Sequence, residues 1–461
     1  MKKVYAFSLI ALGVAVMTAC NKTEEPVVSR PTTRIGESVT PGNVFGAVKG
    51  TMMTGETYIL NGIVTINAGD TLLIQEGVRV HVTQGAALDV KGVFLSLGSK
   101  EKPIWITDPN AVKRDTPTQD LDTDPAYKGI WRGIYCFPTC PLCVIKWTHI
   151  EFCGTSIPDH PEGKSGSNGL YFANVDGYLI FEDSWIYGMT GDGMRIEGGK
   201  INVMRNTIEK EGFTGGDGIY PIGSTMGNVA YNLVIGHSTT SSKPNGTGAT
   251  KYRCDIRTYN NTALNGGFRR TASGRGGSIN YEDHAMGLIY NNLQVNCKYG
   301  VRMVKDPAPD LANIRMGYNY NYGDLESICE HFYPIGYLTP PQETDIPKPN
   351  TFLPAGYQVG DEYDASLLVG RNDPQFVNYP LPPVANLNID NIKLLAYVGS
   401  YDFRLKPTSP AVGAGTDNFE PHFINDPTFP KGEFGTGEIT LPSKDIGAFP
   451  QNNKGNQHFP Q

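Results

Sequence analysis

Between about residues 166 and 304 a short phrase returns once every two to three dozen residues or so, and this repeat limits the folds that the chain can adopt. Each phrase is a glycine that leads into a short run, as in Gly169-Leu-Tyr-Phe, Gly193-Met-Arg-Ile, Gly218-Ile-Tyr, Gly277-Ser-Ile and Gly300-Val-Arg-Met. A polar residue followed by an aliphatic one stands between these runs. Repeats of this length, with strand-like runs and no helical period, are typical of a solenoid of stacked β-coils.

A second pattern precedes the repeat. From Tyr58 to Asp108, apolar and polar residues alternate over runs of four or five, which predicts half-buried strands. Glycines interrupt these runs at intervals near eight, at Gly62, Gly69, Gly77, Gly85 and Gly92. The spacing predicts three strands and three corners per coil. A content of 54 Gly and 33 Pro fits many turns and few helices, so we expect an all-β chain.

Two stretches near the ends of the chain carry a family resemblance. Thr65 to Thr107 contains Ala68-Gly-Asp-Thr-Leu, Gln75-Glu-Gly-Val and Glu101-Lys-Pro-Ile-Trp-Ile-Thr. This stretch resembles the opening coils of right-handed parallel β-helix proteins of the pectate-lyase-like superfamily. Asp373-Pro-Gln-Phe-Val, Tyr401-Asp-Phe-Arg-Leu and Asp445-Ile-Gly-Ala-Phe resemble the closing segment of bacterial β-helix proteins.

The resemblance implies a right-handed parallel β-helix solenoid, a single elongated domain with loop insertions. A β-sandwich module in front of the helix is the alternative for the first coils. We expect coils over residues 46–330, a proline-rich excursion over 331–375 and a closing segment over 376–461. Inserts at 157–167, 238–250 and 266–276 must leave the coils as loops, and such loops commonly form a binding surface.

The N-terminus predicts export. Residues 1–19 combine a charged start, an apolar core and a small-residue ending before Cys20, and this ending resembles a bacterial lipobox in which the cysteine carries lipid. The following Lys22-Thr-Glu-Glu resembles the export signal of surface lipoproteins in the Bacteroidetes. The resemblance implies a lipid anchor at Cys20 in the outer membrane, facing the cell exterior, with residues 20–45 as a flexible tether. Plain secretory cleavage is the alternative.

The charge balance bears on partners. The chain has 39 Lys and Arg against 46 Asp and Glu, which gives a formal charge of −7 without long charged blocks. A nucleic-acid partner needs a basic face, so we expect none. We also expect no oligomer.

Stacking converts the repeat into columns of side chains about 4.8 Å apart. Asn168, Asp192 and Asp217 each precede a repeated glycine, so they should form one column. Two adjacent carboxylates could bind calcium, the one cofactor we consider, or act as an acid and base pair. The alternative is a ladder of Asx side chains that cap the corners. A second column, Asn206, Asn232, Asn261 and Asn292, matches the asparagine ladder of the family and is expected to be structural.

Basic residues gather between Lys251 and Arg302. A lyase that acts on an acidic polysaccharide by β-elimination needs a base near the sugar C5 proton and a cation that neutralises the uronate. We assign these catalytic roles to Arg253, Arg257, His284 and Arg302. The remaining basic residues would bind substrate: Lys251, Arg269, Arg270, Arg275 and Lys298. The alternative is a solvated face with ordinary ion pairs.

Two further observations constrain the chemistry. The paired Asp-Asp, Gly-His-Gly and Arg-Ile-Lys motifs of polygalacturonase-like enzymes are absent from the sequence, as is the Arg-x-Pro-x-x-Arg of familiar pectate lyases. Four clustered cysteines, at positions 136, 140, 143 and 153, would form disulfides in an exported chain, bind zinc or remain buried thiols.

Three functions therefore stand as hypotheses. The first is a surface-anchored β-helix lipoprotein that binds a polysaccharide or host glycan without catalysis. The second is a polysaccharide lyase that uses the basic residues. The third is a non-catalytic adhesin or structural surface protein.

Overall fold

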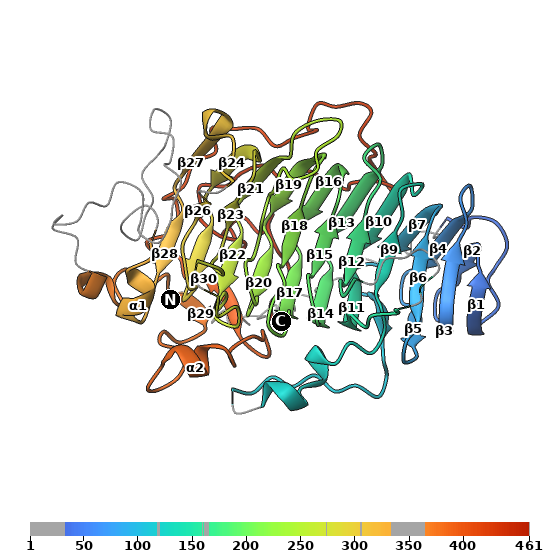
Figure 1. Cartoon of the computed structure of the whole chain (residues 1–461), viewed down its shortest axis with the longest axis horizontal. Helices are drawn as coiled ribbons and strands as arrows, with labels where there is room; N and C mark the ends of the chain where they lie inside the picture. The colour runs from blue at the N-terminus through green and yellow to red at the C-terminus, as the bar shows by residue number, and fades with distance from the viewer. Residues whose placement is uncertain are drawn as a thin grey trace, which may run out of the picture. The chain divides into compact units, whose positions relative to one another are not determined.

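The chain winds into successive coils of three short parallel strands, as seen in a computed structural model (Figure 1). The structure describes residues 33–460 apart from 118–119, 159, 161–165, 273, 305–306 and 333–364, and Arg34–Gln461 form one compact unit. The signal segment, Cys20 and most of the proline-rich excursion lie outside the described residues. The parallel β-helix solenoid expected from the repeat is confirmed.

Each coil contributes one strand to each of three faces. The first face is a ten-stranded parallel sheet. Its strands are β2 (Gly50–Met52), β4 (Thr71–Gln75), β7 (Val93–Leu97), β10 (Leu142–Lys146), β13 (Tyr178–Glu182), β16 (Gly199–Met204), β19 (Thr225–Ala230), β21 (Asp255–Tyr259), β24 (Met286–Tyr290) and β27 (Ile314–Gly317).

The second and third faces are joined by one long strand, β3 (Thr57–Ile66), whose two halves pair with different neighbours. The first half of β3 begins the second face, which continues through β5 (Arg79–Val82), β8 (Ile104–Thr107), β11 (Thr148–Cys153), β14 (Trp185–Met189), β17 (Thr207–Glu211), β20 (Leu233–Ile235), β22 (Thr262–Leu264), β25 (Leu293–Val295) and β28 (Tyr320–Tyr322).

The second half of β3 begins the third face. This face continues through β6 (Ala87–Val90), β9 (Ile134–Cys136), β12 (Leu170–Phe172), β15 (Met194–Ile196) and β18 (Ile219–Pro221). Isolated bridges at Ser242 and Asn245 then lead on to β23 (Asn280–Tyr281) and β26 (Arg302–Met303).

A few elements stand outside the coils. They are β1 (Gly42–Ala47), β29 (Phe376–Asn378), β30 (Asp402–Leu405), the four-residue helices α1 (Glu326–Cys329) and α2 (Ile389–Ile392), and the 3₁₀ turns Leu121–Thr123, Pro125–Tyr127, Leu311–Asn313 and Ala365–Leu368. No helix in the described part of the chain is long and apolar enough to cross a membrane.

The interior is filled by aliphatic side chains that stack from one coil to the next at equivalent positions of the strands. On the third face Ile134, Leu170, Met194 and Ile219 follow one another in register and are almost wholly buried. The repeated glycines begin these strands because neighbouring coils leave no room there. A Cβ atom on Gly193 would lie 2.5 Å from the carbonyl oxygen of the glycine one coil further on.

The predicted asparagine ladder is present at the corner between the first and second faces. The Oδ1 of Asn232 accepts hydrogen bonds from the backbone N (3.1 Å) and Nδ2 (2.9 Å) of Asn206, and its own Nδ2 donates to Asn261 (3.0 Å). The ladder continues through Asn292 to Asn319. These amides satisfy backbone groups that have no water to bind.

The tether ends earlier than residue 45, contrary to expectation. Ser38 forms a bridge with Thr51, and β1 pairs in parallel with β3. These residues cover the open end of the first coils, where backbone groups would otherwise lack partners.

The closing segment covers the first and second faces. Phe423 and Phe429 pack on aliphatic side chains of the first face. Phe376, Phe403 and Phe449 pack on the second face, around Leu233, Leu264 and Leu293.

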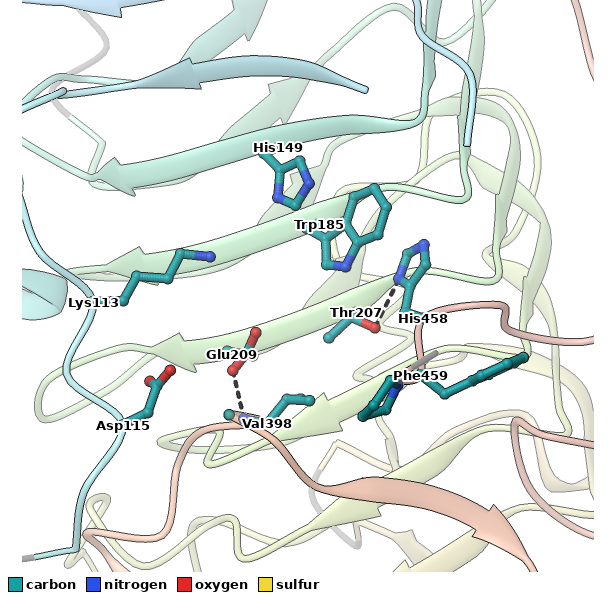
Figure 2. A pocket seen from close by; sticks show the side chains of 11 residues that line it. Lys113, Asp115, His149, Trp185, Thr207, Glu209, Val398, His458 and Phe459 are labelled. Atoms are coloured by element: carbon teal, nitrogen blue, oxygen red, sulfur yellow. Dashed lines mark hydrogen bonds between the residues drawn. The ribbon is translucent and has the colours of Figure 1, made fainter. Parts of the chain in front are cut away.

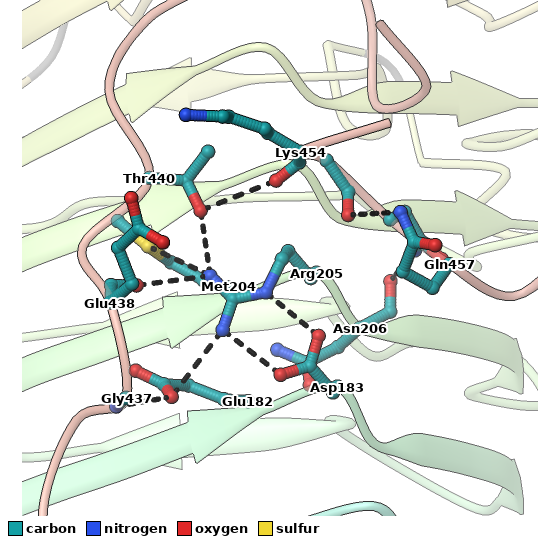
Figure 3. A network of polar contacts seen from close by, with 12 residues as sticks. Glu182, Asp183, Met204, Arg205, Asn206, Gly437, Glu438, Thr440, Lys454 and Gln457 are labelled. Carbon is teal, nitrogen blue, oxygen red and sulfur yellow. Dashed lines mark hydrogen bonds and ion pairs between the residues drawn. The ribbon is translucent and has the colours of Figure 1, made fainter. Parts of the chain in front are cut away.

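Arg205, at the corner between those faces, forms an ion pair within the coils and holds the closing segment by hydrogen bonds (Figure 3). Its guanidinium donates to both carboxylate oxygens of Asp183 (2.7 and 2.9 Å). The same guanidinium donates to the hydroxyl of Thr440 (2.7 Å) and the carbonyl of Glu438 (3.2 Å). The first and second faces are therefore largely covered by the chain itself.

Candidate functional site

The third face carries a row of large polar and aromatic side chains that point away from the core. Tyr135, Tyr171, Arg195 and Tyr220 occupy equivalent positions on β9, β12, β15 and β18. The inward neighbours of these residues belong to the core cluster, so the row lies on the outer side. The register of the following bridges and strands continues the row through Lys243, Asn280 and Arg302. We call these seven residues the third-face row. Arg195, Tyr220 and Lys243 are partly exposed, whereas the other four are buried.

A carboxylate joins two members of the row. The hydroxyl of Tyr171 donates to Oε2 of Glu197 (2.6 Å), and the guanidinium of Arg195 donates to Oε1 of the same carboxylate (2.8 Å). Burial opposes the charge on Arg195, but Glu197 outweighs it and raises the pKa of the guanidinium. About a third of the Arg195 side chain is exposed (31%), so it can meet a ligand.

Lys243 forms the next charged position. Its ammonium pairs with the carboxylate of Asp217 and lies 3.9 Å from the ring centroid of Tyr220, while the guanidinium of Arg195 lies 5.0 Å from the same centroid. Burial disfavours the charge on Lys243, yet Asp217 reverses this and raises its pKa. Burial raises the pKa of Tyr220. Both groups therefore stay protonated at neutral pH, as hydrogen-bond donors rather than bases.

The predicted column of Asn168, Asp192 and Asp217 runs along the start of this face. Each of its aspartates caps the coil that follows: Oδ1 of Asp192 accepts the backbone N–H of Asp217 (2.9 Å), and Oδ1 of Asp217 accepts that of Thr240 (3.2 Å). This is the turn-ladder arrangement. The described residues contain no group of three or more His, Cys, Asp or Glu side chains able to hold a metal ion.

The column also supplies a titratable group. Burial and the charge of Asp217 raise the pKa of Asp192 to about 6. Arg195 lies 3.7 Å from the Asp192 carboxylate. Asp192 is thus a carboxyl group beside the row that changes protonation close to neutral pH.

The four residues predicted to be catalytic are divided among the first face, the third face and the turn between them. Arg253 lies in the turn between the third and first faces and pairs with Asp310. Arg257 is on β21 of the first face, where its buried Nε has no hydrogen-bond partner. His284 is exposed and contacts Asp283 (2.8 Å). Only Arg302 lies in the third-face row. The four residues therefore do not form a single catalytic constellation. Arg257 and Arg302 lie on different faces, whereas Arg253 and His284 each precede the paired residues Asp255 and Met286 by two positions and so share one turn.

The residues predicted to bind substrate divide in the same way. Lys251 pairs with Asp176 at the turn between the third and first faces. Arg269 is buried and donates to three backbone carbonyls, so it anchors a loop. The ammonium of Lys298 donates to the carbonyls of Arg270 and Arg275 (2.9 and 2.8 Å). Arg269, Arg270, Arg275 and Lys298 thus lie in the turns that lead from the second face to the third face in two successive coils.

Arg302 is held in place rather than free. Its Nε donates to Asn280 (3.2 Å) and its guanidinium lies 4.3 Å from the ring centroid of Tyr299. Burial lowers the pKa of Arg302 to about 10. Because its side chain is almost wholly buried, it stabilises the end of the row more than it can contact a polymer.

The cysteines are buried thiols. Cys136, Cys140, Cys143 and Cys153 are free and lie inside the coils, and the three cysteines that follow them in the chain are also free and buried. Burial raises the pKa of Cys136 well above its ordinary value, and the hydrogen bonds that its thiol donates to Cys140 and Cys143 add to the effect. Of the alternatives, the buried thiols are the arrangement found.

We compared the chain with protein-family models, curated proteins and solved structures. No family model matches the chain, and neither a curated protein nor a solved structure matches it.

The sequence prediction missed Tyr171, Arg195, Tyr220 and Lys243. A signal for three of them was available, since each stands two positions after a repeated glycine: Tyr171 after Gly169, Arg195 after Gly193, Tyr220 after Gly218. The position after that glycine faces inward and the next faces outward. Lys243 follows a serine instead, so the glycine repeat does not reveal it.

Proposed function

We propose that the protein is a surface-anchored lipoprotein that binds a polysaccharide along its third face. The observation that carries the proposal is the partly exposed part of the third-face row, where Arg195, Tyr220 and Lys243 stand on successive coils at a spacing of about 4.8 Å. A polymer with repeated hydroxyl and carboxylate groups can meet several of them at once, which multiplies weak contacts into stable binding.

The chemistry of the row suits sugars. The partly exposed ring of Tyr220 offers an apolar surface with a polar tip, and the paired guanidinium of Arg195 and carboxylate of Glu197 offer adjacent donors and acceptors. The cations Arg195 and Lys243 favour a polymer with carboxylate or sulfate groups. The other two faces support the proposal in another way, because the closing segment already occupies much of their outer surface.

A second candidate is β-elimination on an acidic polysaccharide, and the carboxyl of Asp192 favours it. A lyase base must be unprotonated near neutral pH. A pKa of about 6 gives Asp192 that state, whereas Lys243 and Tyr220 remain protonated.

Binding can be tested with a panel of polymers. The purified chain is run in affinity electrophoresis and calorimetry against alginate, pectate, glycosaminoglycans and neutral glycans. We expect one class to bind and the variant Lys243→Gln with Tyr220→Ala to weaken that binding at least tenfold. Lys49→Gln, which removes an exposed lysine paired with Asp70, is the matched control. Equal binding by both variants, or no binding to any polymer, would refute the proposal.

The same mixtures distinguish the lyase. Unsaturated uronate absorbs in the ultraviolet, so a rise in absorbance that is lost in Asp192→Asn identifies elimination. Binding without absorbance leaves the non-catalytic function.

The anchor has its own test. Cells that express the chain are labelled with a radioactive or clickable fatty acid, and we expect label on the chain that Cys20→Ser removes. Protease added to intact cells should digest the chain if it faces the exterior. An unlabelled wild-type chain in the medium would show plain secretion instead.

A further inference from the structure

A pocket of about 370 Å³ opens on the second face, away from the third-face row (Figure 2). Three separate parts of the chain form it. The strands β11, β14 and β17 supply His149, Trp185, Thr207 and Glu209; the loop before η1 (Leu121–Thr123) supplies Lys113 and Asp115; and the closing segment supplies Val398, Gly399 and residues 458–460. Its volume falls in the range of small-ligand sites.

One wall of the pocket is a rigid stack of rings. Trp105, His149 and Trp185 lie on successive strands with centroids 3.6 and 4.0 Å apart, and His458 continues the stack at 3.6 Å. The hydroxyl of Thr207 lies 2.9 Å from Nδ1 of His458. Both faces of Trp185 are therefore covered. A ligand meets the edges of these rings and cannot stack flat on them.

The charges around the pocket do not balance. Lys113 pairs with Glu151 (2.7 Å), and Lys210 pairs with Asp124 (2.6 Å). The carboxylates of Asp115 and Glu209, which also line the pocket, are left without such a pair.

Neither of these two carboxylates has an ion-pair partner among the described residues. Asp115 accepts a hydrogen bond from the hydroxyl of Tyr187 (3.3 Å), and Glu209 accepts one from the backbone N–H of Val398 (2.6 Å). Figure 2 shows both side chains directed toward the space between the loop that carries Asp115 and strand β17.

The two imidazoles do not supply the missing positive charge. Burial lowers the pKa of His149 to about 4 and lowers that of His458 well below its ordinary value. His149 is more than nine-tenths buried, and its Nδ1 lies 3.6 Å from Oε1 of Glu151. The pocket thus combines two carboxylates that form no ion pair among the described residues with two imidazoles that stay neutral at pH 7.

We propose that this pocket binds a primary ammonium group carried on a ring-sized ligand with hydroxyl groups, as in an amino sugar. An ammonium has three donors, which match the carboxylates of Asp115 and Glu209 and leave one for a ring hydroxyl or water. The ring body fits beside Val398 and Phe459 and against the ring edges. This site does not depend on the polysaccharide proposed for the third face.

The protonation of Glu209 should govern the affinity. Burial raises the pKa of this carboxyl to about 7, against the opposing effects of Lys113 and the Val398 N–H. The charged and titratable groups around it are Lys113, Asp115, His149, Glu151, Tyr187, Lys210 and His458. Ionised Glu209 attracts the ammonium, so binding should strengthen by several-fold between pH 5.5 and pH 8.

The test uses two matched probes and calorimetry with the full chain at pH 8. 4-Aminocyclohexanol carries the ammonium on a six-membered ring, and cyclohexane-1,4-diol has the same ring without charge. We expect the amine to bind at least tenfold more tightly than the diol. Asp115→Asn with Glu209→Gln should abolish that difference. The control Asp70→Asn with Glu76→Gln removes the same charge from carboxylates paired with surface lysines and should leave it intact.

Three results would overturn the proposal: equal affinity for both probes, unchanged amine binding in the pocket variant, or wild-type affinity that does not change between pH 5.5 and pH 8. The pH measurement needs no variant, so it decides the matter even if the pocket variant fails to fold. Lys243→Gln, which tests the third face, should not alter amine binding. The two proposals can therefore fail separately.

Discussion

Replacement of Asn232 by alanine should remove one step of the asparagine ladder. Asn232 is completely buried at the corner between β19 and β20. Its side chain makes four hydrogen bonds: Oδ1 accepts two from Asn206, and Nδ2 donates one to the carbonyl of Val203 (3.0 Å) and one to Oδ1 of Asn261 (3.0 Å). The change leaves the backbone outline of the corner intact but takes all four bonds away.

The magnitude follows from what is left behind. Nδ2 of Asn206 keeps its bond to Phe181 (2.8 Å), and Oδ1 of Asn261 keeps the backbone N–H of residue 232 (3.0 Å). The backbone N–H of Asn206 and the carbonyl of Val203 lose the amide that satisfied them, and water does not reach this corner. A buried polar group without a partner costs about 1–3 kcal/mol. We therefore expect the free energy of unfolding to fall by about 3 kcal/mol.

Urea unfolding followed by tyrosine and tryptophan fluorescence measures this change. Asn418→Ala is the control, because Asn418 is exposed and its substitution should change stability by less than about 0.5 kcal/mol. Hydrogen exchange gives a local readout: the Asn206 amide should exchange faster in Asn232→Ala. If Asn232→Ala is as stable as the control and the Asn206 amide stays protected, the ladder does not stabilise the corner as reasoned here.

Two further changes test the closing segment and the pocket. Arg205→Met leaves the buried Asp183 carboxylate without its guanidinium, so we expect the free energy of unfolding to fall by about 3 kcal/mol. Proteolysis near Thr440 should also become faster, because Arg205 no longer binds this residue. Resistance to proteolysis equal to that of the wild type would contradict a role of Arg205 in holding the closing segment. Glu209 binds a proton more tightly when folded, since its pKa rises from 4.5 to about 7. The folded state should therefore lose about 3 kcal/mol as the pH rises through that interval, and Glu209→Gln should remove this loss in urea unfolding at pH 5 and pH 8. A wild-type stability that does not fall between these pH values would contradict it.

The coils could be predicted because their signals are local. Gly193 marks the start of a third-face strand because the next coil comes so close, and Asn232 marks a corner because its amide must reach the coils on either side. Each residue repeats its role once per coil, so the chemistry appears in the sequence as a period. The same period contained the third-face row, in the position two residues after the glycine.

The basic residues were misplaced for the converse reason. Arg253 and Arg302 are close in the sequence, but a coil turns through three faces in a few dozen residues. Loops of unequal length, such as 265–279, shift the phase further. Proximity along the chain therefore says little about proximity in space, whereas an equal position within the repeat says much.

The second-face pocket left no pattern in the sequence at all. Lys113 comes from a loop, Glu209 from a strand and His458 from the end of the chain, and each appears once. Their meeting depends on the docking of the closing segment, which no period describes. A site built from non-repeating parts needs the folded structure before it can be found.

This construction links ligand binding to the docking of the closing segment. The pocket exists only where Val398 and His458 lie against the second face. Ligand binding therefore stabilises the docked closing segment, and docking strengthens ligand binding by the same coupling free energy. The third-face row has no such dependence, because its residues come from the coils alone. A ligand of the pocket would therefore protect the closing segment from proteolysis, and a polymer on the third face would not.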